Sequence, residues 1–124
     1  MLLVTPPAFL PIHFEASVQA GKHVFMEKPL ACDAPGIRKI LATGELADKK
    51  NIKVVVGLQN RYDPGYIDMV TQLKGGVIGD IVSASDYYLI GPIHGVERSA
   101  GQTEMEYQMR NWRYFNWLWA GSPA

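Results

Sequence analysis

The sequence predicts an α/β fold, with a parallel sheet and helices followed by the start of an α+β second domain. Short, continuous apolar runs alternate with longer stretches in which apolar residues recur at helical spacing. Glycine and proline punctuate these segments at short intervals. After residue 79 the pattern changes to serines and tyrosines interleaved with apolar residues, as in a sheet with one wetter face. We therefore divide the 124 residues into segments 1–79 and 80–124.

The chain opens with a predicted strand over residues 2–4, which Pro6 and Pro7 bring to an end. A helix follows, because apolar residues recur at every fourth position: Leu10, Phe14 and Val18. Gly21 supplies the helix stop. Residues 24–26 are continuously apolar, which predicts a short buried strand.

A second helix is expected to begin after Asp33, an N-cap residue, with Pro35 in its first turn. Five residues share one apolar face of this predicted helix: Ile37, Ile40, Leu41, Gly44 and Ala47. Lys49 and Lys50 suit its C-terminal end, where cations meet the negative end of the helix dipole.

Residues 52–58, with three successive valines, predict the clearest buried strand. Asp63 and Pro64 then predict the cap and first turn of a third helix, closed by Gly75 and Gly76. Its apolar stripe is Tyr66, Ile67, Val70 and Leu73. This order of strands and helices with short connections predicts right-handed crossovers between parallel strands.

The second segment is predicted as a strand over 81–90, a loop over 91–101 and a helical, aromatic-rich stretch. The last of these rests on roughly helical spacing of large apolar residues: Met105, Met109, Trp112, Phe115 and Trp119. We expect these aromatic residues to lie in a core or a subunit interface.

Composition excludes several classes of protein. Twelve basic residues balance twelve acidic ones, and no basic run indicates a nucleic-acid or membrane partner. The single cysteine, Cys32, forms no internal disulfide and is expected to be buried and inert. No metal site is predicted. The N-terminal residues lack a charged region and a long apolar stretch, so we expect a cytoplasmic protein.

A candidate site follows the strand at 24–26. Glu27 and Lys28 come directly after it, and Pro29 then fixes the backbone. Ligands of open parallel sheets bind beyond the carboxyl ends of the strands. A lysine there can exchange a proton with a substrate hydroxyl. The alternative interpretation is a solvated loop that happens to carry an acid and a base.

Four short stretches in order resemble the Gfo/Idh/MocA family of nicotinamide-dependent oxidoreductases. They are Thr5-Pro6-Pro7, Ala20-Gly21-Lys22-His23-Val24, Glu27-Lys28-Pro29 and Gly57-Leu58-Gln59-Asn60-Arg61-Tyr62-Asp63-Pro64. The resemblance implies that residues 1–79 are the C-terminal part of a Rossmann-type dinucleotide-binding domain. It implies that 80–124 begin the substrate and oligomerisation domain.

The same resemblance assigns roles to residues. It implies NAD or NADP as cofactor, a sugar or polyol as substrate, a homo-oligomer, and Lys28 as the catalytic residue. Cofactor contacts are expected from Thr5, Pro6, Pro7, Glu27, Lys28 and Pro29. Arg61 and Tyr62 are expected to bind substrate, although Arg61 could instead pair with Asp63 or Asp68. The family usually has a histidine where Leu10 stands; His13 could partly substitute, or could be an ordinary helix histidine.

The sequence contains no G-x-G-x-x-G motif, which in dinucleotide-binding domains holds the pyrophosphate. We therefore expect an interior fragment of such an enzyme, which by itself binds NAD or NADP weakly and is inactive. The alternatives are a non-catalytic truncated remnant and an interaction module built on the aromatic segment. An unpaired edge at residues 2–4 and the aromatic cluster also predict an oligomeric or aggregation-prone chain.

Overall fold

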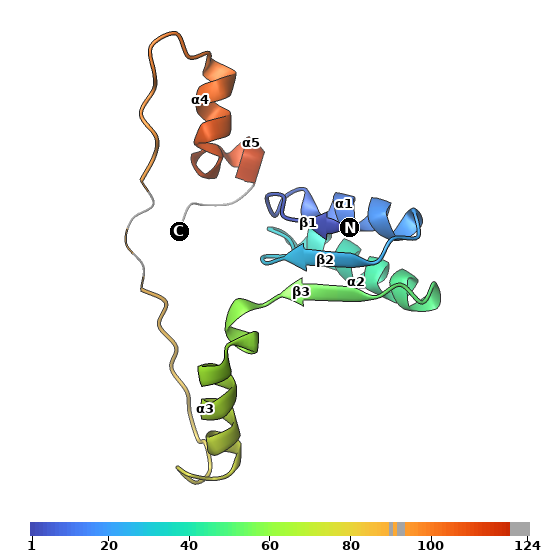
Figure 1. Cartoon of the computed structure of the whole chain (residues 1–124), viewed down its shortest axis with the longest axis vertical. Helices are drawn as coiled ribbons and strands as arrows, with labels where there is room; N and C mark the ends of the chain where they lie inside the picture. Colours follow the sequence, from blue (N-terminus) through green and yellow to red (C-terminus); the bar gives the residue numbers. More distant parts are fainter. Residues whose placement is uncertain (90, 92–93, 120–124) are drawn as a thin grey trace. The chain divides into compact units, whose positions relative to one another are not determined.

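The structure, a computed structural model, describes residues 1–89, 91 and 94–119. Two compact units are present: residues 1–57 with the C-terminal part from 93, and residues 58–92. The first contains a three-stranded parallel sheet in the order β1-β2-β3, formed by β1 (Leu2–Leu3), β2 (Val24–Glu27) and β3 (Val54–Gly57) (Figure 1). The predicted α/β fold with a parallel sheet is therefore confirmed.

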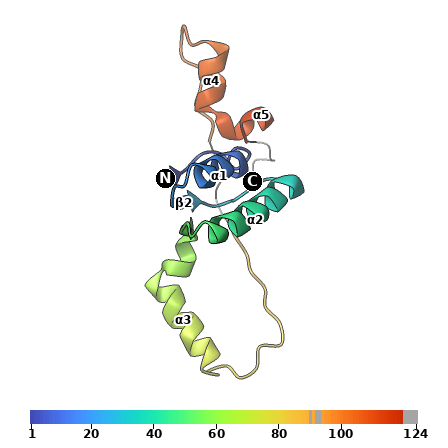
Figure 2. The ribbon, with the colours of Figure 1, turned by 90° about the vertical axis from the view of Figure 1, so that its right-hand side faces the viewer.

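Two helices connect these strands, α1 (Leu10–Gln19) and α2 (Ala34–Lys49), and they pack on the sheet (Figure 2). The predicted stop of the first helix is confirmed, because Gly21 has a φ of 70°, a left-handed conformation that glycine adopts without strain. The predicted cap of the second is also confirmed, since the Gly36 backbone N–H donates to Asp33 Oδ1 at 2.7 Å.

The core lies between one face of the sheet and the two helices. Its fully buried members are Leu10, Phe14 and Val18 from α1, joined by Leu3, Val24, Met26, Ile40, Ala47 and Ile52. The helix predicted from the four-residue spacing thus buries the residues that predicted it. This packing positions the carboxyl ends of the three strands, because β1 and β2 both rest on α1 and its neighbour α2.

The opposite face of the sheet is exposed, which corrects the prediction of buried strands. The register places Leu2, Phe25 and Val55 in one row across the three strands. Their side chains are 74%, 36% and 47% exposed. The predicted strand over 52–58 is also shorter, Val54–Gly57. Continuous apolar runs resemble strands buried on both faces, whereas here the packed helices reach only alternate residues.

The second unit contains a 3₁₀ turn, η1 (Gln59–Tyr62), and the helix α3 (Pro64–Lys74). Asp63 caps α3 as predicted, accepting from the backbone N–H groups of Gly65 and Tyr66 at 2.9 and 3.2 Å. The predicted strand over 81–90 is wrong for residues 81–89, which have no regular secondary structure; Ile90 lies outside the described residues. Strand propensity needs a neighbouring strand to pair with, and none pairs with 81–89 in the described chain.

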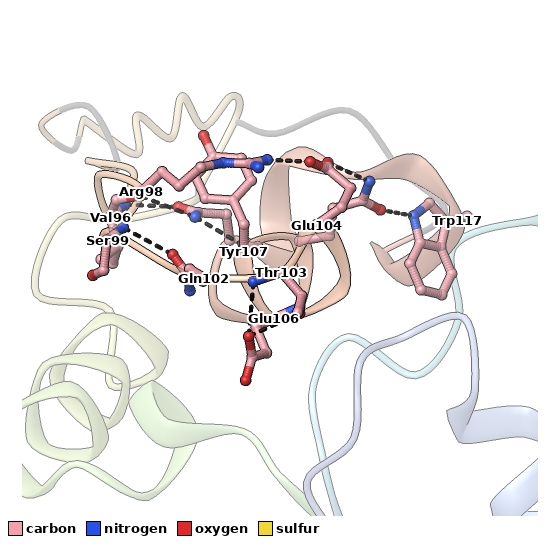
Figure 3. A network of polar contacts seen from close by, with 11 residues as sticks. Val96, Arg98, Ser99, Gln102, Thr103, Glu104, Glu106, Tyr107 and Trp117 are labelled. Carbon is pink, nitrogen blue, oxygen red and sulfur yellow. Dashed lines mark hydrogen bonds and ion pairs between the residues drawn. The ribbon is translucent and has the colours of Figure 1, made fainter.

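The C-terminal part is helical, as its roughly helical spacing of apolar residues predicts, and it is divided into three short elements. It comprises α4 (Glu104–Arg110), a 3₁₀ turn η2 (Trp112–Tyr114) and α5 (Asn116–Trp119). Thr103 and Glu106 form a reciprocal capping box at the start of α4 (Figure 3). Asn111 ends that helix because its side chain bonds backbone groups of Val96 and Tyr107.

No helix within the described ranges is long and apolar enough to cross a membrane. The compact units divide after residue 57 and near residue 92. The domain boundary at residue 79 stays a prediction, because a division into compact units need not coincide with a division into folded domains.

Candidate functional site

The candidate site is built on the carboxyl ends of the three parallel strands. Glu27 is the last residue of β2 and lies opposite Gly57, the last residue of β3. Lys28 follows immediately, and Thr5 comes two residues after the end of β1. Parallel strands bring their carboxyl ends to one edge of a sheet, which is where open α/β sheets bind ligands. The sheet therefore positions Thr5, Glu27 and Lys28 at the edge expected for a cofactor.

Glu27 and Gly57 fit each other closely. A methyl group added to Gly57 would lie 2.5 Å from Glu27 Oε1, 2.8 Å from its Cδ and 2.9 Å from its Oε2. The absence of a side chain at Gly57 thus makes room for the Glu27 carboxylate. Glu27 is half-buried, and among the described residues its carboxylate has no hydrogen-bond or ion-pair partner. The carboxylate remains available to accept a hydrogen bond from a ligand.

Lys28 is exposed, and its ammonium group likewise has no hydrogen bond or ion pair within the part of the chain that the structure describes. The peptide bond between Lys28 and Pro29 is cis, and Pro29 is exposed. A lysine at a sheet edge with no protein partner can contact a bound molecule without first breaking an ion pair. This arrangement suits a proton donor or acceptor better than a structural salt bridge.

Thr5 is linked to the helix that follows it. Its hydroxyl Oγ1 lies 3.0 Å from His13 Nδ1, and the Phe9 ring stacks on the same imidazole with centroids 6.2 Å apart. Ser17 Oγ donates to the backbone carbonyl of His13 at 2.8 Å. His13 is half-buried and in contact with a predicted cofactor residue, a link that sequence reasoning missed. The four-residue spacing of Phe9, His13 and Ser17 on one helix face is the pattern that could have indicated it.

The prolines before α1 form its entry turn. The Phe9 backbone N–H donates to the Pro6 carbonyl at 3.0 Å, Pro6 is half-buried and Pro7 is buried. Both prolines lie directly after Thr5, and their rings restrict the backbone conformation after the end of β1. Their predicted contact with a cofactor stays a prediction.

Arg61 and Tyr62 belong to the other compact unit, where both side chains are exposed. With Tyr66, Ile67 and Val70 they line a groove of about 510 Å³ along α3. Neither Asp63 nor Asp68 forms an ion pair with Arg61; Asp63 caps α3, and Asp68 Oδ2 accepts from Gln72 Nε2 at 2.7 Å. The guanidinium group is therefore available, and the substrate role of Arg61 and Tyr62 stays a prediction.

Cys32 is exposed, so the prediction of a buried thiol is wrong. It lies in the short connection between β2 and α2, one residue before the Asp33 cap, and neither element buries it.

The described residues contain no group of three or more His, Cys, Asp or Glu side chains that could hold a metal ion.

Known proteins similar to this chain include inositol dehydrogenases and a 3-ketoreductase. Inositol 2-dehydrogenase of Gluconacetobacter diazotrophicus is 36% identical over 90 residues, which are 70% of this chain and 26% of that protein. The structure of scyllo-inositol dehydrogenase from Lactobacillus casei with bound NAD(H) and scyllo-inositol matches with 34% identity and a TM-score of 0.53. That match covers 61% of this chain and 22% of the other.

A third match is KijD10, a 3-ketoreductase from Actinomadura kijaniata solved with TDP-benzene and NADP. It is 26% identical with a TM-score of 0.52, over 64% of this chain and 24% of that one. No protein-family model matches the sequence. The chain is homologous to part of a Gfo/Idh/MocA oxidoreductase.

Homology to the Gfo/Idh/MocA oxidoreductases confirms the family resemblance and the Rossmann type of fold. The cofactor prediction agrees as well, since one solved neighbour binds NAD(H) and another binds NADP. This chain spans about a quarter of the length of the inositol 2-dehydrogenase it matches. The activity and substrate of the whole protein are therefore matters for proposal.

Proposed function

We propose that this chain is the catalytic-lysine segment of an NAD- or NADP-dependent oxidoreductase that acts on a sugar, a cyclic polyol or a related alcohol. The observation that carries the proposal is the placement of Glu27 and Lys28 at the carboxyl end of the central strand, where neither side chain has a hydrogen-bond or ion-pair partner among the described residues. The polyol class is supported by the relatives, two of which are inositol dehydrogenases by name.

The residues at the sheet edge fit the nicotinamide end of such a cofactor. Glu27 offers unpaired carboxylate oxygens, which match the donor hydroxyls of a ribose. The space above Gly57, which a Cβ would fill, leaves room for that carboxylate. Thr5, fixed by His13, supplies a further hydroxyl at the neighbouring strand end. The cofactor supplies hydride transfer, and the protein supplies placement and proton handling.

In the proposed reaction, Lys28 handles the proton of the reacting alcohol. During oxidation the Lys28 Nζ, in its neutral amine form, would accept the proton of the hydroxyl, and the hydride from the same carbon would pass to the bound nicotinamide. During reduction the same nitrogen returns the proton to the carbonyl oxygen. Glu27 would hold the ribose beside it. A substrate-binding role for Arg61 and Tyr62 is proposed separately, because both side chains are exposed and line the groove along α3. We further propose that the intact enzyme is a homo-oligomer, as the exposed apolar sheet face and aromatic segment favour.

The test is a chimera in which residues 2–79 replace the matching segment of the Lactobacillus casei enzyme, assayed with scyllo-inositol and NAD. Lys28→Ala should lower kcat by about 10²–10⁴-fold and change KM little, because proton transfer acts in the transition state. Lys22→Ala is the matched control, since Lys22 is exposed and its ammonium also has no partner in the described chain. A chimera that turns over equally well with either substitution would contradict the catalytic role of Lys28, and a chimera without any turnover would favour the non-catalytic remnant.

A further inference from the structure

A small pocket with an unusual concentration of cationic side chains lies in the C-terminal part of the chain. Its volume is about 200 Å³, and it is bounded by the segment around Val96 and the end of α4. His94, Arg110 and Arg113 contribute its nitrogen-bearing side chains, and Trp112 and Tyr114 contribute aromatic walls. Among the described residues, no aspartate or glutamate lines it. Two arginines therefore border the pocket without an acidic residue of the described chain beside them in its lining.

The two arginines are not engaged elsewhere in the part of the chain that is described. Neither Arg110 nor Arg113 forms an ion pair or a hydrogen bond through its guanidinium there. Arg113 lies over the Trp112 ring at 5.2 Å, a contact that leaves the edge of its guanidinium free to donate. Arg98, nearby in sequence, is different: it pairs with Glu104 and stacks on Tyr107 (Figure 3). Within the described residues, the two pocket arginines therefore lack an ion pair, whereas Arg98 of the same segment has one.

The pocket is held in shape by a buried amide. Asn111 is only 6% exposed, and its Oδ1 accepts from the Val96 backbone N–H at 2.7 Å. Its Nδ2 donates to the carbonyls of Val96 and Tyr107, both at 3.0 Å. These bonds fasten the stretch that carries His94 to the end of the helix that carries Arg110. The segment before α4 and the end of that helix are thereby fixed together, so the backbone that carries these side chains is held in place before any ligand arrives.

Attraction to the negative end of a helix accounts for one of these side chains only. Arg110 is the last residue of α4, where a cation is favoured. Arg113 lies in η2, and His94 comes from a segment 16 residues earlier than Arg110. Two arginines from neighbouring elements and a histidine from an earlier segment thus line one cavity. A bound anion explains their meeting, because planar guanidinium groups bind phosphate oxygens with two hydrogen bonds each.

We propose that this pocket binds a phosphate-class anion, namely the phosphate or diphosphate group of a small molecule. Pockets for whole drug-sized ligands measure about 300–1,000 Å³, so this volume suits an anionic group and not a complete cofactor. The group could belong to a phosphorylated sugar or to a nucleotide, and the recognition chemistry is the same. The proposal does not depend on the role of Lys28.

The experiment titrates inorganic phosphate into the full 124-residue chain. Amide chemical shifts and isothermal titration calorimetry measure the binding. Phosphate should shift the amides of residues 94–96 and 110–114 and bind one ion per chain. Arg110→Gln and Arg113→Gln should each weaken the affinity by at least about tenfold, since a charge-assisted hydrogen bond is lost. Arg38→Gln is the matched control, because Arg38 is an exposed arginine of α2 without an ion pair in the described chain. It should leave binding unchanged.

The outcomes are decisive in both directions. Equal weakening by Arg38→Gln, or shifts spread over the whole chain, would mean general charge attraction and would overturn the pocket. Unchanged affinity in both pocket variants would overturn it as well. Titrations with glucose 6-phosphate and with ADP then distinguish the sources: the tighter ligand identifies a sugar phosphate or a nucleotide. Asn111 is untouched in these variants, and far-UV circular dichroism checks that each is folded like the parent.

Discussion

Gly57→Ala is the substitution that most directly tests the construction of the site. The added methyl group would lie 2.5 Å from Glu27 Oε1, whereas ordinary contacts begin near 3.4 Å. The carboxylate must therefore move by about 1 Å, and a misplacement of this size near reacting groups can cost about 10²-fold in rate. Gly57 has no left-handed backbone conformation, so alanine is compatible with its strand geometry. We expect the activity to fall while the fold survives.

The assay is kcat in the same chimera with the Lactobacillus casei enzyme, together with thermal unfolding. Gly57→Ala should lower kcat by up to about 100-fold and change the free energy of unfolding by no more than about 1 kcal/mol. Gly44→Ala is the control, because nothing lies within 4 Å of a Cβ added to that helix residue. It should stabilise the helix by about 1 kcal/mol and leave kcat unchanged.

The refuting result is specific. If Gly57→Ala keeps parental kcat while Glu27→Ala abolishes it, the position of the carboxylate enforced by Gly57 is irrelevant to catalysis. If both variants keep parental kcat, Glu27 has no part in the site. A loss of activity accompanied by a large loss of stability would also contradict the reasoning, because the clash would then have spread into the sheet.

Three further expectations concern the fold. Phe14→Ala, at the most buried aromatic residue of the core, should cost about 3–5 kcal/mol in chemical denaturation; a cost under 1 kcal/mol would mean that α1 is not packed. Phe25→Ser with Val55→Thr should reduce hydrophobic-dye binding and self-association in sedimentation, because both side chains lie on the exposed sheet face. Hydrogen bonds from the backbone and side chain of Thr103 lower the pKa of Glu106, so the capping box should hold above the ordinary value of 4.5 and weaken as the pH falls through the lowered pKa. Helical chemical shifts of α4 that are the same at pH 3 and pH 7, or unaffected by Thr103→Ala, would contradict this.

The candidate site could be located from sequence because its placement depends on local rules. A strand of continuous apolar residues followed by Glu27 and Lys28 puts these side chains at a sheet edge wherever the strand pairs in parallel. The N-caps Asp33 and Asp63 were equally predictable, since a carboxylate directly before a helical run accepts hydrogen bonds from free N–H groups of the first turn, two or three residues further on. These features involve residues close together in the chain.

Features that depend on distant partners were not predictable. The exposed row of Leu2, Phe25 and Val55 follows from which face the helices cover, a property that apolar content alone does not encode. Residues 81–89 have strand composition but no strand, because pairing requires a partner that composition cannot supply.

The sequence by itself determined the alternation of strands and helices, the helix caps, and the identity of the acid and base after the central strand. Tertiary structure alone decided that Gly57 makes room for Glu27, that His13 contacts Thr5, and that Asn111 bonds Val96 beside a pocket lined by two arginines. The physical reason is the separation, along the sequence, of the residues that interact. Backbone propensity and capping act over three or four residues, whereas steric fit and side-chain pairing act across a gap of 8 to 30 residues that only the folded chain closes.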